Sequence, residues 1–303
     1  MHVEEIVSRL WPGLQAAIEP LGGGITNENY RVTVAGEAYV VRIGGKDTEH
    51  LGIDRAVEHA ATLAAAAAGV GPDVVAYLEA EGSLVTRFIA GRPIPPAEMR
   101  RPEMIRCAAA ALRRFHDGPA IPGRFDAFRV VEAYHDTAVV HGVRIPAAYG
   151  RASELAGEIE RARGPQPIRP CHNDLLNANF IDDGRAVRIV DWEYAGMGDV
   201  YFDLANFSVN HELVDEQDRI LLEAYLPEAK SSEAASLRLM RFMSDFREAM
   251  WGVVQQGISQ LDFDFVAYAE EHFARLERTA ADPGFADALA RTLPPVSTGP
   301  PDA

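Results

Sequence analysis

Cysteine is scarce in this sequence, and the two that occur, Cys107 and Cys171, stand in no C-x-x-C pair and beside no histidine cluster. We therefore expect neither a disulfide framework nor a structural zinc site, and a reducing, cytoplasmic setting is the default. Long apolar runs are missing too, because the longest alanine-rich stretch, residues 60–68, is far shorter than the roughly 20 residues that cross a bilayer. The first 15 residues carry two glutamates, which favours an amphipathic helix over a signal peptide.

Positive charge is also in short supply, since 29 lysines and arginines face 45 aspartates and glutamates, a formal net charge of −16. A nucleic-acid partner held through its phosphates would need the opposite balance. We expect instead a small-molecule substrate, cationic or neutral, with no nucleic acid and no membrane span, and we allow for a homodimer. The 48% of apolar and 24% of charged residues are typical of a folded globular protein.

Strand and helix signals divide the chain into two parts. The first 89 residues combine β-branched and aromatic runs with one alanine-rich stretch. They predict a small α+β lobe with strands at 30–34, 38–43, 74–78 and 83–89 and a helix at 54–68. Proline and glycine then cluster at 90–96, where they interrupt both helices and sheets, and we place the lobe boundary there.

Helical patterns dominate the rest of the chain, at 102–117, 152–163, 212–226, 232–257 and 264–280. One short hairpin interrupts them, from Asn179 to Asp191, with a turn at Asp182-Asp-Gly-Arg185. The expected organisation is a small lobe at 1–89, a larger helical lobe at 90–293 and a mobile polar tail at 294–303.

The residues that could perform chemistry flank this hairpin. The stretch Cys171-His-Asn-Asp-Leu-Leu-Asn-Ala-Asn179 precedes it, and Asp191-Trp-Glu-Tyr194 closes it. Phosphoryl transfer needs hard oxygen ligands for Mg²⁺ and one carboxylate to accept the proton of the attacking hydroxyl. Asn179 and Asp191 supply the ligands and Asp174 supplies the base, in the order and spacing of the protein-kinase catalytic loop and its metal-binding aspartate.

The run Asp191-Trp-Glu-Tyr-Ala195, followed by Gly198-Asp-Val-Tyr-Phe-Asp-Leu-Ala-Asn206, resembles the choline/ethanolamine kinases and aminoglycoside phosphotransferases. The resemblance implies a two-lobed protein kinase-like fold, with a β-rich N-terminal lobe that binds nucleotide and a larger, mainly helical C-terminal lobe for catalysis and substrate. It implies ATP and Mg²⁺ as cofactors and a small-molecule hydroxyl as acceptor. It also makes His172 a structural residue of the loop and gives Asp203 the role of bracing that loop.

The same resemblance assigns a nucleotide site. Leu21-Gly-Gly-Gly-Ile-Thr-Asn-Glu-Asn-Tyr30 stands where the family's glycine-rich loop lies, so its N–H groups are expected to approach phosphates. Arg42 takes the place of the strand lysine of protein kinases, and Glu58 is expected to pair with it. The segment after the last strand corresponds to the hinge that reads adenine. The cofactor-binding candidates are Gly23, Gly24, Thr26, Asn27, Arg42, Glu58, Arg87, Phe88 and Ile89.

The expected acceptor is a small amino alcohol. The helix Arg247-Glu-Ala-Met-Trp-Gly-Val-Val-Gln-Gln256 is similar to the late helix of choline kinases that carries W-G-x-W, with Trp251 as the first tryptophan and Val254 in place of the second. Losing one aromatic wall weakens a site for a quaternary ammonium, so ethanolamine becomes credible beside choline, which stays the first candidate. The expected substrate-binding residues are Glu193, Tyr194 and Trp251, with Asp199 as a further candidate.

Other interpretations stay open. A different hydroxyl compound, such as an aminoglycoside, thiamine or a sugar derivative, would be served by the same catalytic loop. A pseudokinase would bind nucleotide without transferring phosphate, although the joint presence of Asp174, Asn179 and Asp191 argues against it. An unrelated helical protein would carry the two aspartates as turn residues, and the ordered succession of loop, hairpin and D-L-A motif argues against that.

Overall fold

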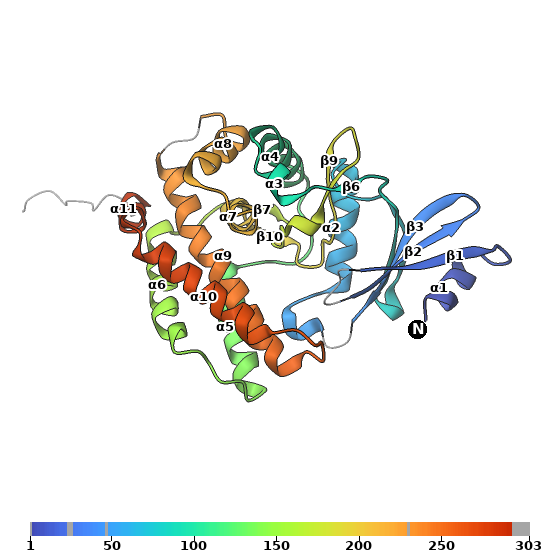
Figure 1. The fold of residues 1–303 in the computed structure, drawn as a ribbon, viewed down its shortest axis with the longest axis horizontal. Helices are drawn as coiled ribbons and strands as arrows, with labels where there is room; N and C mark the ends of the chain where they lie inside the picture. Colours follow the sequence, from blue (N-terminus) through green and yellow to red (C-terminus); the bar gives the residue numbers. More distant parts are fainter. Residues whose placement is uncertain (1, 23–26, 46–47, 229–230, 293–303) are drawn as a thin grey trace, which may run out of the picture.

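The protein has two lobes of unequal size (Figure 1). The computed structural model describes residues 2–22, 27–45, 48–228 and 231–292, so the tail expected to be mobile, 294–303, lies outside the described residues. An antiparallel sheet with one short helix forms the smaller lobe, at the right of Figure 1, and helices make up most of the larger one. This arrangement confirms the expected α+β architecture.

The small lobe is built on a sheet with the strand order β1-β2-β3-β5-β4, in which every neighbouring pair is antiparallel. Ala35 and Gly36 join β2 to β3 with positive φ angles of 52° and 86°, as a two-residue hairpin turn that follows the strand twist requires. The strands are β1 (Ala16–Leu21), β2 (Asn27–Val34), β3 (Glu37–Gly44), β4 (Val74–Leu78) and β5 (Ser83–Arg87).

Helix α1 (Val3–Leu10) covers one face of this sheet. Its apolar residues Val3, Ile6 and Val7 point inward, while its glutamates stay exposed. This is the amphipathic pattern that the sequence predicted. The buried residues of helix and strands form a separate apolar cluster, which we call the sheet core: Val3, Ile6, Val7, Val32, Val34, Val41, Leu78 and Val85.

Helix α2 (Arg55–Ala67) packs with the large lobe rather than with the sheet core. Asp54 caps it by accepting hydrogen bonds from two N–H groups of its first turn at 2.8 and 3.2 Å. Its buried Ala61 and Ala65 belong to the apolar cluster of the large lobe, and Figure 1 shows the helix between the sheet and the other helices. We call this cluster the main core; its large members include Ile105, Phe115, Trp192 and Phe246.

The chain crosses between the lobes at residues 88–91. Strand β5 ends at Arg87, and β6 (Arg92–Pro93) already pairs with β8 (Phe180–Asp182) of the large lobe. A Cβ atom on Gly91 would stand 2.5 Å from the carbonyl oxygen of Asp182. Because no side chain fits there, glycine is required for the crossing to pass so close to β8.

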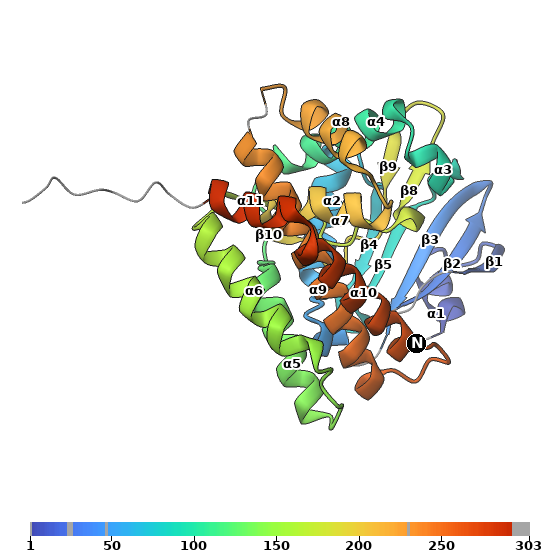
Figure 2. The same cartoon turned by 60° about the vertical axis from the view of Figure 1, so that its left-hand side comes forward.

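Helix α9 runs through the middle of the large lobe and contacts α5, α7, α10 and α11 (Figure 2). The five expected helices are present as α4, α6, α8, α9 and α10, whereas α5, α7 and α11 were not predicted. The helices are α3 (Pro96–Met99), α4 (Pro102–His116), α5 (Ala127–Val140), α6 (Ala148–Arg163), α7 (Val200–Asn210), α8 (Asp215–Tyr225), α9 (Ser231–Ile258), α10 (Phe265–Ala281) and α11 (Pro283–Thr292).

Two small sheets frame the loop 172–179. Strand β7 (Ile168–Cys171) pairs with β10 (Gly196–Asp199), and β8 pairs with β9 (Val187–Ile189) as the expected hairpin. The loop leaves β7 and enters β8 through the 3₁₀ turn η3 (Asn177–Asn179), so both of its ends are fixed. Two further 3₁₀ turns are η1 (Thr48–Leu51) and η2 (Glu79–Glu81). Among the described residues, no helix has the length and apolar character needed to cross a membrane.

Candidate active site

Polar side chains of helix α7 hold the loop 172–179 in shape. Asp203 is fully buried, and its carboxylate accepts the N–H groups of His172 and Asn173 at 2.7 and 2.6 Å. Asn206, one turn later, accepts a further loop N–H group at 2.5 Å. The His116 ring of α4 lies with Nε2 2.9 Å from the same Asp203 carboxylate, which can only accept, so that nitrogen carries a proton. Asp203 thus contacts the loop as a brace would.

His172 is buried and neutral. Its Nε2 lies 3.0 Å from the carbonyl oxygen of Val190, which fixes the proton on that nitrogen. Its Nδ1 then accepts the N–H of Asp174 at 3.2 Å. Burial lowers the pKa of His172, which favours this uncharged state. Because both ring nitrogens are used inside the protein, the ring sets the loop's geometry and is not placed to take a proton from a substrate.

Asp174, the expected base, is 8% exposed. Burial raises its pKa to about 8, and the carboxylate of Glu248 acts in the same direction. The Arg247 guanidinium opposes this shift, with Nη1 3.3 Å from Oδ1 of Asp174. A carboxylate that is desolvated yet paired with a cation can accept a proton near neutral pH.

Asn179 and Asp191, the expected metal ligands, stand at the two ends of the hairpin. The N–H of Val190 donates to the Asn179 carbonyl oxygen at 3.0 Å, so Asp191 follows directly beside it. The Asn179 amide nitrogen donates to the backbone carbonyl of Asp174 at 2.8 Å, which leaves its amide oxygen as the atom for a cation. Asp191 has a φ of 68°, a conformation rare for a residue other than glycine. Two such oxygen donors fit a Mg²⁺ ion.

Two arginines and three carboxylates form a connected group of ion pairs where the two lobes meet. We call it the interlobe cluster (Arg42, Arg55, Glu58, Asp191 and Glu193). The expected pair of Arg42 and Glu58 is in contact, with Nη1 2.5 Å from Oε1, and the same Nη1 lies 2.8 Å from Asp191. Arg55, which the sequence did not single out, contacts Glu58 at 2.7 Å and Glu193 at 3.3 Å. Each arginine therefore joins α2 to the segment that follows the hairpin.

Glu193, expected to bind substrate, lies in this cluster. It is buried and accepts a hydrogen bond from the side-chain amide of Asn27 at 2.8 Å. Asn27, expected on the nucleotide side, begins strand β2, so this bond also spans the two lobes. Gly23, Gly24 and Thr26 lie outside the described residues.

The expected adenine-reading segment uses much of its hydrogen bonding inside the small lobe. The N–H of Arg87 donates to the Asp73 carbonyl at 2.8 Å, and the N–H of Phe88 donates to the Ala38 carbonyl at 3.0 Å. The Arg87 side chain is exposed and pairs with Glu37. Those two N–H groups can serve a ligand only by giving up these bonds.

Asp174 also contacts a group of mostly buried residues around helix α9. We call this group the α9 cluster (Tyr134, Tyr194, Arg247, Glu248, Trp251 and Tyr268). The Trp251 indole donates to the Tyr194 hydroxyl at 3.0 Å, which brings the two expected pocket residues together. Arg247 bridges Asp174 and Glu248, with its guanidinium carbon 4.5 Å above the Tyr194 ring. Glu248 is buried and also accepts the Tyr268 hydroxyl at 2.8 Å.

Known proteins share both the sequence pattern and the fold. A family model described as phosphotransferase enzyme family matches residues 17–239. A choline/ethanolamine kinase family protein from Mesorhizobium loti has a crystal structure that matches with a TM-score of 0.82 and 34% identity, covering 96% of this chain and 99% of that one. The chain belongs to the choline/ethanolamine kinase family. It is a small-molecule kinase with a protein kinase-like fold, as expected.

More distant members of the family agree. The probable choline kinase 3 of Arabidopsis thaliana is 24% identical over 300 residues, covering 84% of each chain. The crystal structure of LicA in complex with AMP matches with a TM-score of 0.74 and 21% identity, covering 91% of this chain and 96% of that one. At that identity the match supports the fold of this kinase.

Two other positions considered for the acceptor pocket of this kinase have surroundings of their own. Val254 is fully buried in the main core, to which Trp251 also belongs. The residues that reach the α9 cluster beside Trp251 are Arg247 and Glu248, about one turn earlier on the helix. Asp199 does not join the cluster, since it pairs with Arg163 and caps α7 through the N–H of Tyr201.

Sequence reasoning missed Arg247, Glu248 and Arg55 as site residues of this kinase. For the first two a signal existed, because they are an adjacent charged pair inside the otherwise apolar run 246–254, where a charge is costly unless it is paired. Arg55 carried no such signal, since a charged residue at the start of a helix is ordinary. His116, which the sequence did not single out, contacts Asp203.

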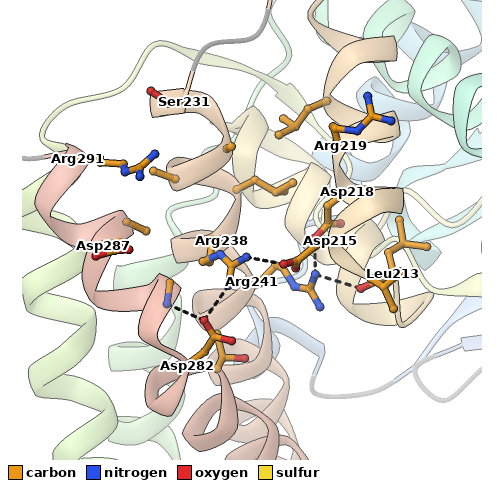
Figure 3. Close-up of a pocket in the computed structure, with 18 of the residues that line it drawn as sticks. Leu213, Asp215, Asp218, Arg219, Ser231, Arg238, Arg241, Asp282, Asp287 and Arg291 are labelled. Carbon is orange, nitrogen blue, oxygen red and sulfur yellow. Dashed lines mark hydrogen bonds and ion pairs between the residues drawn. The ribbon is translucent and has the colours of Figure 1, made fainter.

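A groove of about 890 Å³ lies apart from these residues, between α8, α9 and α11 (Figure 3). Arg238 crosses it and pairs with Asp215 and Asp282 at 3.0 Å each. Arg241 contacts Asp218 and the Leu213 carbonyl on its inner side. The arginines that line the groove are thus partly neutralised by neighbouring carboxylates.

Proposed function

We propose that this kinase transfers the γ-phosphoryl group of ATP to the hydroxyl group of a small amino alcohol, choline or ethanolamine, with Mg²⁺ as cofactor. The observation that carries the proposal is the position of Asp174. Its backbone contacts Asn179 of the hairpin and its carboxylate contacts Arg247 of the α9 cluster. The family relatives named for choline and ethanolamine support this acceptor class, and the AMP complex of LicA supports an adenine nucleotide.

In this mechanism Asp174 orients the acceptor hydroxyl and takes its proton as the new oxygen–phosphorus bond forms. Arg247 keeps the carboxylate in position and favours its ionised form. Asn179 and Asp191 would hold Mg²⁺, which neutralises charge on the phosphate oxygens when it is bound. Arg42, fixed by Glu58, is the protein's own cation on the nucleotide side. Positioning and fixed charges then supply most of the rate enhancement.

The test is ADP release measured with Mg²⁺-ATP against choline, ethanolamine, their methylated intermediates, thiamine and kanamycin. We expect turnover with an amino alcohol. In Asp174→Ala we expect kcat to fall by at least about 100-fold, because the base is removed. ATP binding, measured by calorimetry, should persist in that variant.

Asp136→Ala is the matched control, because Asp136 is an exposed carboxylate on α5 outside the site. It should retain the turnover number of the unchanged protein. Phosphorylation of thiamine or kanamycin alone would contradict the amino alcohol acceptor. ATP binding without turnover of any acceptor would indicate a pseudokinase.

A further inference from the structure

Arg247 is buried although only one nitrogen of its guanidinium is paired with a carboxylate. Its side chain is 1% exposed, and that nitrogen, Nη1, serves both Asp174 and Glu248. The other two nitrogens, Nε and Nη2, are buried and have no carboxylate or carbonyl partner among the described residues. A buried donor left unpaired is costly, so a group that accepts from these nitrogens would be bound favourably.

These two nitrogens form one edge of the guanidinium. Nε and Nη2 point in parallel, and this is an edge with which arginine grips a carboxylate through two hydrogen bonds. The stacking of the guanidinium on the Tyr194 ring, together with the bond from Nη1 to Glu248, fixes the direction of that edge. The Tyr134 hydroxyl donates to the Leu51 carbonyl at 3.2 Å, and its oxygen also interacts with the Arg247 guanidinium. A carboxylate bound there would take over this weaker, neutral contact.

Arg247 differs from two other buried or partly buried arginines in what it contacts. Arg163 also has Nε and Nη2 buried without a partner, but it pairs with Asp199 on α7's N-terminal side, outside the catalytic group. Arg42 beside the hairpin has its charge shared between Glu58 and Asp191. Arg247 alone among these three has an open edge and touches the expected base.

We propose that the acceptor of this kinase carries a carboxylate in addition to its hydroxyl and amine, and that Arg247 binds this carboxylate through Nε and Nη2. The inference rests on the proposed function, because it refines the amino alcohol to one of the hydroxy amino acid class. The amine has a partner in Glu248, the buried carboxylate of the same cluster. Arg247 is then a specificity-determining residue.

A matched pair of acceptors tests the proposal, since serine is ethanolamine with one added carboxylate. Carnitine and choline form a second pair, in which carnitine carries an added carboxymethyl group on the hydroxyl-bearing carbon. We expect kcat/KM for L- or D-serine, or for carnitine, to exceed that for the partner without the carboxylate by about 100-fold, because a site built around a charged donor pair discriminates strongly against an analogue that leaves it unpaired. The difference should lie mainly in KM.

Arg247→Lys keeps the charge but has no two-donor edge, so it should lose most of this preference. Arg247→Met leaves Glu248 buried without its counter-ion, so Arg247→Met with Glu248→Gln is the safer variant for folding, which circular dichroism checks. Arg247→Met and the double variant should each abolish the preference for the acceptor with the carboxylate. Arg238→Met, on the same helix but in the surface groove, is the matched control and should keep it.

Calorimetric binding of serine and ethanolamine in the absence of ATP separates this proposal from the proposed function. Tighter binding of serine that is lost in Arg247→Lys supports the inference even if no phosphate is transferred. Equal or weaker binding and turnover of serine, unaffected by either Arg247 variant, overturns it and leaves phosphorylation of choline or ethanolamine standing.

Discussion

At the scale of single residues, Asp203 is the side chain on which the shape of the loop 172–179 depends most. Its carboxylate is fully buried and contacts His116 and two consecutive N–H groups. Each oxygen is used, so the side chain has no atom to spare. Both oxygens must therefore remain acceptors for the loop to keep its shape.

Asp203→Asn exchanges one of these oxygens for an NH₂ group, which then faces a donor. Since hydrogen bonds to charged groups contribute about 1.5–3 kcal/mol each, we expect the free energy of unfolding to fall by at least about 2 kcal/mol. The turnover number should fall as well, because Asp174 follows the braced residues. Urea denaturation and steady-state kinetics measure the two effects.

Asp54→Asn is the control for that exchange. Asp54 is an exposed cap of α2, and asparagine caps a helix about as well as aspartate. Stability and turnover should both be unchanged. Equal losses in the two variants would mean that the brace contributes nothing specific.

The mutual placement of the candidate residues was predictable where they are close together along the chain. Asp174, Asn179 and Asp191 lie within 18 positions of one another, so a hairpin suffices to bring them together. Their partners come from separate helices: Asp203 was assigned only through the family resemblance, and Arg247 was not predicted at all. A sequence pattern predicts the loop itself. The charged residues that contact the loop from distant helices depend on how those helices pack.

At the scale of elements, the contact between α9 and α10 depends on Gly252. A Cβ atom there would lie 2.9 Å from the Tyr268 ring and 3.2 Å from the backbone nitrogen of Ala269. The two helices can therefore approach closely only with glycine at this position. Tyr268 in turn donates to Glu248, which ties the helix contact to the α9 cluster.

Gly252→Ala should push α10 outward. Overpacking of this kind costs about 1–3 kcal/mol, and the better helix propensity of alanine offsets up to about 1 kcal/mol. We expect a net loss in the free energy of unfolding and a higher KM for the acceptor. Gly150→Ala, in α6 where a Cβ atom meets nothing within 4 Å, should instead be neutral or stabilising.

Two elements escaped prediction for physical reasons. Strand β1 contains Pro20, which normally argues against a strand, but β1 is at the edge of the sheet, where a missing N–H is tolerated. Helix α7 is buried on most sides, so its sequence lacks the alternation of apolar and polar faces that marks a surface helix.

At the scale of the whole molecule, His211 makes stability depend on pH. It is buried at the end of α7 and contacts the rings of Phe180 and Phe207. Burial lowers its pKa from the ordinary value of 6.5 to about 4. The unfolded chain therefore binds a proton at higher pH than the folded protein does, and protonation favours unfolding.

The contribution of His211 is fully present above pH 6.5 and is lost as the pH falls toward 4. Its slope is about 1.4 kcal/mol per pH unit in that window. Urea denaturation at pH 7.5 and pH 5 should show a smaller decrease in His211→Gln than in the unchanged protein. His50→Gln, at an exposed histidine, should show the unchanged decrease. Identical pH dependence in His211→Gln would contradict the assignment.

The separation of the sheet core from the main core has a consequence for cooperativity. The two lobes follow the chain, but the cooperative folding units need not, because α2 packs with the large lobe while the strands on both sides of it pack with α1. Local opening of the sheet would break the contact of α2 with β4 and separate Arg42 on β3 from Glu58 on α2. Arg42 and its partner are thus held by two different cores, and only the closed molecule has both in contact.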